Sequence, residues 1–192
     1  MNFATQLFES EHLILAAYDP EKDAAIEAGF TRNLDYAWSL DHDGIPHPLT
    51  TFEVKKKREE ALKESEEKES SLYFSIRLKE DDRFLGVLAF PWISWSNRRG
   101  GFTLNMGDAV DDRLYYSEAL QMTLRYAFEE LSLFHTHIWT GSHDEAHLER
   151  LIEAGMNIEV RQRQMVYRNG RLWDNLSVGI SQENWLKKNS EE

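Results

Sequence analysis

Apolar residues recur along this chain with two periods: about two residues in some segments, as in a strand, and about 3.6 in others, as in a helix. Residues 13–18 form a short apolar run that Asp19-Pro20 ends, a pattern typical of a buried strand followed by the start of a helix. Short apolar or alternating segments between turn residues predict further strands at 72–78, 84–95, 102–106, 134–140, 156–167 and 172–180. Helical spacing or charge pairing predicts helices at 21–30, 34–40, 51–68, 117–131 and 144–154.

Turn residues support this division. Asn169-Gly170 separates the last two predicted strands and indicates a hairpin, and Gly155 is placed to end the helix 144–154. Strands and helices in this order predict an α/β fold: a single domain with a mixed, largely antiparallel sheet flanked by helices. We expect residues 1–186 to form that domain and 187–192 to form a flexible tail.

Composition narrows the function classes. The chain has 192 residues and a net charge of −12, which opposes binding to nucleic acids and to anionic membrane surfaces. It has no cysteine, which excludes disulfides, thiolate zinc sites and a cysteine nucleophile. No apolar run has transmembrane length, and the first residues do not resemble a signal peptide, so we expect a cytoplasmic protein.

The negative charge is concentrated at the start of the chain. Residues 1–50 carry a net −7, because nine acidic residues are opposed only by Lys22 and Arg32. The stretch 51–68 is highly charged but nearly balanced in sign, which is typical of a solvated helix. An acidic surface near the N-terminal region favours cationic ligands.

Several short motifs resemble those of the GNAT superfamily of N-acetyltransferases, in particular the branch that acetylates the N-termini of ribosomal proteins. The motifs are Leu13-Ile14-Leu15 with Asp19, Ser117-Glu118-Ala119-Leu120, Tyr126-Ala127-Phe128, Gly155-Met156, Glu159, Arg163, Asn169-Gly170, Asp174 and Glu183-Asn184-Trp185. The resemblance extends over nearly the whole chain. It implies the GNAT fold, with acetyl-CoA as co-substrate and an amine as acceptor.

The resemblance also implies where acetyl-CoA is bound. Its pantetheine arm would lie between the strands 101–106 and 134–140, and its pyrophosphate would lie at the N-terminus of the helix that starts near Ser117. The residues that would contact the co-substrate are Met106, Arg113, Leu114, Tyr115, Tyr116, Ser117 and Asp144.

This chain departs from the family pattern at that helix. The family's cation and two glycines correspond here to Asp111, Leu114 and Tyr116, and bulky side chains at glycine positions weaken the prediction that acetyl-CoA binds. Gly101 stands where many relatives have a general-base Glu, and Leu151 where many have a general-acid Tyr.

Proton-transfer groups must therefore come from other residues. His143, His147 and Tyr116 are weak candidates, although packing against the helix start is the stronger interpretation of Tyr116. The chain has seven histidines, a residue that often binds metal ions. The pairs His135/His137 and His143/His147 have no obvious carboxylate that completes a ligand set, so we predict no metal site. His42 and His47 are read as solvated loop residues.

The aromatic residues Phe90, Trp92 and Trp95 can be read in two ways: as core packing, or as the lining of an acceptor pocket or dimer contact. Two functions remain open. The first is transfer of an acetyl group from acetyl-CoA to a primary amine, with a cationic acceptor such as a protein N-terminus, a polyamine or an aminocyclitol, by an enzyme that could form a homodimer. The alternative is a non-catalytic binding protein with the GNAT fold that has lost acetyl-CoA binding.

Overall fold

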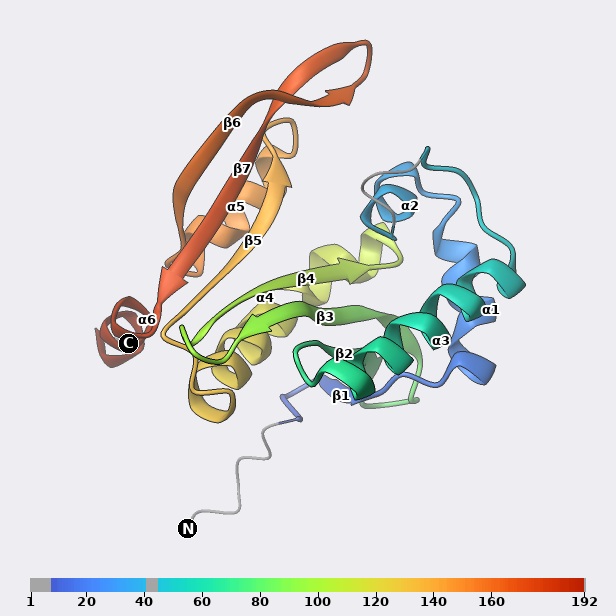
Figure 1. Ribbon diagram of the computed structural model, residues 1–192, viewed down its shortest axis with the longest axis horizontal. Coiled ribbons are helices and arrows are strands. Elements are labelled where there is room, and N and C mark those ends of the chain that lie inside the picture. The colour runs from blue at the N-terminus through green and yellow to red at the C-terminus, as the bar shows by residue number, and fades with distance from the viewer. Residues whose placement is uncertain (1–7, 41–44, 192) are drawn as a thin grey trace. The chain divides into compact units, whose positions relative to one another are not determined.

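A computed structural model describes residues 8–40 and 45–191 (Figure 1). The strands are β1 Leu13–Ala17, β2 Leu72–Leu78, β3 Phe84–Ser94, β4 Arg99–Met106, β5 His135–Gly141, β6 Asn157–Arg168 and β7 Arg171–Ser181. The α-helices are α1 Pro20–Phe30, α2 Leu34–Leu40, α3 Thr51–Lys68, α4 Ala109–Arg125, α5 Glu145–Glu153 and α6 Gln182–Glu191, and a π-helical turn, Tyr126–Glu130, follows α4. In these residues no helix is both long and apolar enough to cross a membrane.

The seven strands form one sheet in the order β1-β2-β3-β4-β5-β7-β6, which confirms the predicted α/β fold with a largely antiparallel sheet. β4 and β5 are parallel and pair over three positions, from Arg99 opposite His135 to Gly101 opposite His137. β5 pairs with β7 along its whole length, so the remaining part of β5 is held by β7.

The chain divides into two compact units. The first contains Met1–Pro91 and Leu104–Thr123, and the second contains Trp92–Thr103 and Leu124–Glu192. In the first unit, Phe30 of α1 and Leu62 of α3 pack against the buried side chains of Tyr18, Phe84 and Val87. Burial of these apolar side chains is what attaches α1 and α3 to the strands.

Glu27 is the centre of a buried polar cluster in the first unit. Its side chain is fully buried, and it accepts hydrogen bonds from the hydroxyls of Tyr18 (2.6 Å) and Tyr36 (3.0 Å) and from the guanidinium of Arg58. Burial, followed by the Glu27 carboxylate, raises the pKa of both tyrosines, so they remain donors. This cluster joins the end of β1 to α1, α2 and α3.

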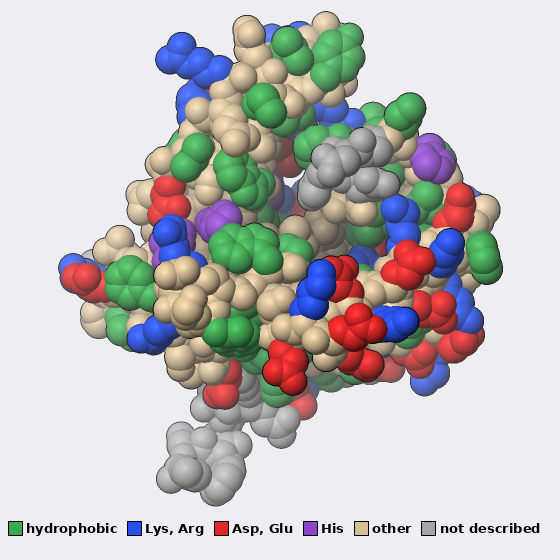
Figure 2. All heavy atoms as spheres, viewed as in Figure 1, with side chains coloured by type: hydrophobic (Ala, Val, Ile, Leu, Met, Phe, Trp, Pro, Cys, Tyr) green, Lys and Arg blue, Asp and Glu red, His purple; other side chains and the backbone are tan. Residues whose placement is uncertain are grey.

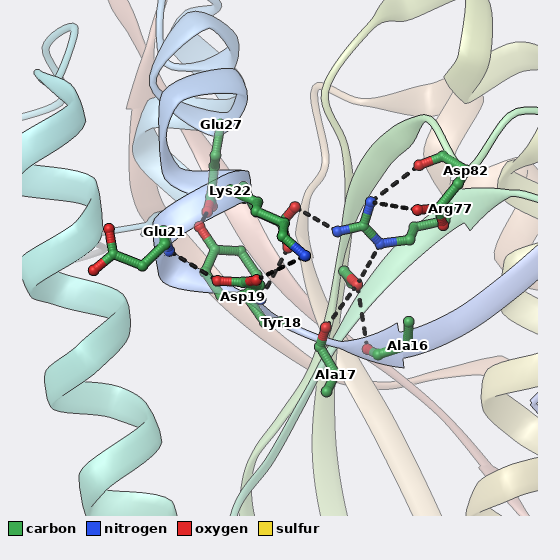
Figure 3. A network of polar contacts seen from close by, with 11 residues as sticks. Ala16, Ala17, Tyr18, Asp19, Glu21, Lys22, Glu27, Arg77 and Asp82 are labelled. Carbon is green, nitrogen blue, oxygen red and sulfur yellow. Dashed lines mark hydrogen bonds and ion pairs between the residues drawn. The ribbon is translucent and has the colours of Figure 1, made fainter.

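A second buried ion pair lies beside it. Asp23 of α1 pairs with Arg77 of β2. Arg77 also donates to the backbone carbonyl of Asp82 (Figure 3). The same view shows Asp19, which accepts a hydrogen bond from the backbone N–H of Glu21 (3.0 Å) and so begins α1 as its N-cap. Pairing keeps these buried charges compatible with the fold.

In the second unit, β6 and β7 form the predicted hairpin. Asn169 and Gly170 both have positive φ (51° and 77°), as a two-residue hairpin turn requires, and Gly155 has φ 89° directly after α5. Thr140 of β5 contacts His147 of α5, which places α5 on the face of β5 that carries Thr136, Ile138 and Thr140.

Two element starts lie three or more residues before the predicted ones, and one helix was not predicted. β4 begins at Arg99 rather than at residue 102, and α4 begins at Ala109 rather than near Ser117. The helix α6 was not predicted; it extends to Glu191, so residues 187–191 form its last turns, and fraying of that end stays a prediction. α4 begins early because the Asp108 side chain caps it and no glycine or proline interrupts 109–116.

Candidate functional site

The N-terminus of α4 is capped by the side chain of Asp108. Asp108 Oδ1 accepts a hydrogen bond from the backbone N–H of Val110 (2.7 Å), and the backbone carbonyl of Asp108 accepts one from Asp112 (2.9 Å). Ser117 therefore lies in the middle of the helix, and the prediction that the helix starts there, with free N–H groups for a pyrophosphate, is wrong.

The residues predicted to form the phosphate loop instead form helical turns. Leu114 points to solvent with 64% of its surface exposed, whereas Tyr116 is 2% exposed and packs in the core. Tyr115 lies beside the ring of His12, with the centroids 6.0 Å apart, and Arg113 is exposed. Leu114 and Tyr116 thus do not stand where they would block a glycine turn. Met106 lies at the end of β4, just before this helix.

Carboxylates dominate the start of α4. Asp111 is nearly buried and forms a bidentate ion pair with Arg83, with N–O distances of 2.6 and 3.0 Å. Asp108 and Asp112 add two further negative charges within the same turn. Arg83 is thus paired within the protein, and the carboxylates at this helix start oppose an anionic pyrophosphate.

The N-terminus of α5 is capped in the same way. Asp144, predicted as a co-substrate contact, accepts a hydrogen bond from the backbone N–H of His147 (3.1 Å). The Nδ1 atom of His147 lies 3.0 Å from Thr140 Oγ1, which positions this predicted catalytic candidate between α5 and β5. His143 packs against Trp173, with ring centroids 5.7 Å apart, and its Nδ1 is buried and has no hydrogen-bond partner among the described residues.

A group that the predictions missed lies over Gly101. A Cβ atom built on Gly101 would lie 2.9 Å from Nε1 of Trp92 and 3.4 Å from Nε2 of His137. The side chains of β3 and β5 therefore converge on the space that a larger residue at 101 would fill. The signal in the sequence is the alternation of His135 and His137, since residues two apart on a strand share a face.

His137 belongs to a larger polar group. His135 Nε2 lies 2.6 Å from a Glu159 carboxylate oxygen, and the His135 and His137 rings are 6.0 Å apart. Within the described ranges, no three His, Asp or Glu side chains are grouped so that they could hold a metal ion. A histidine in contact with a carboxylate is a group that can take part in proton transfer.

Only one of the three aromatic residues Phe90, Trp92 and Trp95 is buried in the core. Phe90 is fully buried and packs in the core, whereas Trp92 and Trp95 are exposed on 44% and 49% of their surface. An exposed tryptophan beside a histidine can contact a ligand.

The acidic N-terminal region is more neutral than its formal charge. Figure 2 shows acidic and basic side chains interspersed over α1 and α3. Four acids of this region pair with cations beyond residue 50, namely Glu9–Lys79, Glu21–Lys55, Asp23–Arg77 and Glu27–Arg58, and Asp19 pairs with the nearby Lys22. His47 is exposed and contacts the backbone carbonyl of Ile45 (2.7 Å), whereas His42 lies outside the described residues. The predicted acidic surface is therefore reduced by partners that are distant in the sequence.

Comparison with known proteins relates this architecture to a family. Residues 12–159 match the family profile described as an acetyltransferase (GNAT) domain, whereas no curated protein sequence matches the chain. The spermidine N-acetyltransferase of Vibrio cholerae in complex with CoA and spermine has a similar structure, with TM-score 0.76 and 16% identity over 92% of this chain and 99% of that one. A dodecameric structure of the same enzyme has TM-score 0.73 and 15% identity, over 93% and 99%. RimL, a ribosomal-protein α-N-acetyltransferase in complex with coenzyme A, has TM-score 0.73 and 18% identity, over 90% and 95%.

Proposed function

This chain belongs to the acetyltransferase (GNAT) family, and on that premise we propose that it transfers an acetyl group from acetyl-CoA to a primary amine. The match over residues 12–159 is the observation that carries the proposal, because it extends from β1 through β4, β5 and α5. The structural relatives that act on spermidine and on a protein amino terminus support a primary amine as acceptor.

The acceptor is proposed to be cationic. The net charge of −12 attracts cations to the molecule as a whole, even though several acids of the N-terminal region are paired. A protein N-terminus, a polyamine and an aminocyclitol all meet this description. We further propose a homodimer in the cytoplasm; the dodecameric relative supports self-association in such a fold.

Acetyl-CoA should raise the melting temperature if the proposal is correct. At 100 times its dissociation constant a ligand stabilises a protein by about 2.7 kcal/mol, which corresponds to roughly 5–10 °C for a domain of this size. The measurement is a thermal melt with acetyl-CoA, followed by release of the CoA thiol in the presence of spermidine or a peptide with a free amino terminus. Absence of both responses at millimolar acetyl-CoA contradicts the proposal.

A second function is supported by the start of α4. Because Asp108, Asp111 and Asp112 occupy the place of a phosphate-binding turn, a protein with this helix could bind an amine without acetyl-CoA. Under that alternative the fold is a binding module. A melt that responds to amines but not to acetyl-CoA supports it.

Asp108→Asn separates charge from capping at this helix. Asparagine caps a helix about as well as aspartate does, so the variant removes one negative charge and keeps the helix start. We expect acetyl-CoA to bind about two- to fivefold more tightly at low salt, as one charge at a helix terminus allows. The measurement is calorimetry at two salt concentrations, with Glu59→Gln on the exposed face of α3 as the control. An unchanged affinity excludes repulsion at Asp108.

A further inference from the structure

The second unit presents a sheet face that α5 does not cover. Side chains of β5 alternate, and Thr136, Ile138 and Thr140 face α5, so His135, His137 and Trp139 lie on the opposite face. Figure 2 shows histidine side chains at the surface over β5, beside hydrophobic ones. This face is therefore accessible to a ligand.

Two tryptophans flank His137 on that face. The ring centroid of His137 is 5.6 Å from that of Trp92 and 6.3 Å from that of Trp139. Both indoles remain 42–44% exposed, while His137 is half-buried between them. Gly101, opposite His137 in the ladder, lets the Trp92 indole pack against β4, because a Cβ atom there would lie 2.9 Å from Trp92 Nε1. The result is an aromatic platform with an imidazole at its centre.

The indole faces of this platform favour a cation. The Glu159 carboxylate lies against Gly179 of β7, which is opposite His137, and it holds His135 through Nε2. Indole faces attract an ammonium group through their negative quadrupole. The positive charges that act on His137 are those of His135, which contacts Glu159, and of Arg99, which is exposed to solvent at the start of β4.

We propose that the face formed by Trp92, Gly101, His137 and Trp139 binds the acceptor as a primary ammonium ion, and that Nε2 of His137 takes a proton from it. This Trp-His face would supply both the acceptor site and the proton acceptor of the acetyl transfer. The inference rests on that proposed function. The family position for a general base carries no side chain here, so the imidazole reaches the same space from the neighbouring strand.

The proposed acetyl transfer moves two protons from the ammonium ion. The ammonium gives one proton to His137, and the free amine nitrogen attacks the acetyl carbonyl carbon. The C–S bond of the thioester breaks as the C–N bond forms, and the second amine proton passes to the departing sulfur. The products are the amide, the thiol and the proton on His137, which passes to solvent.

The protonation state of His137 suits this role. Burial lowers the pKa of His137 below its ordinary value of 6.5, and His135 and Arg99 lower it further, while Glu159 opposes them. The imidazole is thus neutral at pH 7 and can accept a proton. As the pH falls through that pKa the base becomes protonated, so kcat/KM should fall on an acidic limb that lies below pH 6.5.

Binding can be tested without any acetyl transfer. The full chain is titrated with spermidine and with butylamine while the histidine ring signals are followed by NMR. We expect the His137 signals to shift with either amine and to remain unshifted with butanol. Trp92→Ala should weaken amine binding about 2- to 30-fold, whereas Trp95→Ala, at a similarly exposed tryptophan after β3, should leave it unchanged. Unshifted His137 signals overturn the inference.

Kinetics provide the second test. His137→Gln should lower kcat/KM about 10²- to 10⁴-fold and abolish the acidic limb, with KM for the amine nearly unchanged and the melting curve retained. If acetyl transfer occurs and neither His137→Gln nor Trp92→Ala alters it, the Trp-His face is wrong while the proposed function holds. If amines shift the His137 signals and no acetyl is transferred, the face holds as a binding site and the proposed function fails.

Discussion

Replacing Glu27 by alanine should lower the free energy of unfolding by about 3–5 kcal/mol, the cost of leaving one partner of a buried ion pair uncompensated. The guanidinium of Arg58 and the hydroxyls of Tyr18 and Tyr36 would each lose their acceptor inside the first unit. Chemical denaturation of the purified protein measures the change.

Two controls make this result specific. Glu21→Ala lies on the same helix, and its side chain is 73% exposed beside Lys55, so it should change stability by less than about 1 kcal/mol. Glu27→Gln keeps the shape and two acceptor lone pairs but removes the charge, and it should fall between the two. A loss below about 1 kcal/mol for Glu27→Ala would show that the cluster does not hold α1, α2 and α3 together.

Replacing Leu151 by alanine should cost about 2–5 kcal/mol, the range for a large-to-small change in a packed core. Leu151 on α5 is fully buried, as are Met156 after the helix and Leu176 and Val178 on β7. The truncation leaves a cavity in the apolar core of the second unit. Thermal and chemical denaturation report the loss.

Ile152 supplies a matched control for this prediction. It is the next residue on α5 and is 45% exposed, so Ile152→Ala should change stability by about 0.5 kcal/mol or less. Equal losses for the two variants would contradict the assignment of Leu151 to the core. Leu151 stands where many relatives have a general-acid Tyr, and its complete burial gives it a packing role in this chain.

Most elements could be predicted because their signals are local. The helix 51–68 was predicted with the boundaries that the structure has, since Thr50 and Glu53 form a capping box and the charged pairs continue to Lys68. The strand 72–78 and the Asn169-Gly170 hairpin were also predicted from local signals, namely β-forming residues and a two-residue turn. α6 was missed because its stretch is short, polar and without a clear apolar period.

The start of α4 could not be predicted from local pattern alone. The resemblance places the phosphate loop just before Ser117, but Asp108 caps the helix two turns earlier, and Arg83, directly before β3, pairs with Asp111. That ion pair joins residues 28 positions apart, so no window of helix propensity contains it. The same limit applies to Glu27, whose partner Arg58 lies 31 positions away.

The sequence by itself determined the α/β fold, the positions of most strands and helices, the net charge and the absence of cysteine chemistry. These depend on periodicity, turn residues and composition, which are properties of neighbouring residues or of the whole chain. Only the tertiary structure decided that Glu9, Glu21, Asp23 and Glu27 pair with distant cations, that Asp108 caps α4 and Arg83 pairs with Asp111, and that Trp92, Gly101 and His137 meet. Those outcomes depend on strand register and on contacts between distant residues, because three adjacent strands place their side chains together only once the sheet has formed.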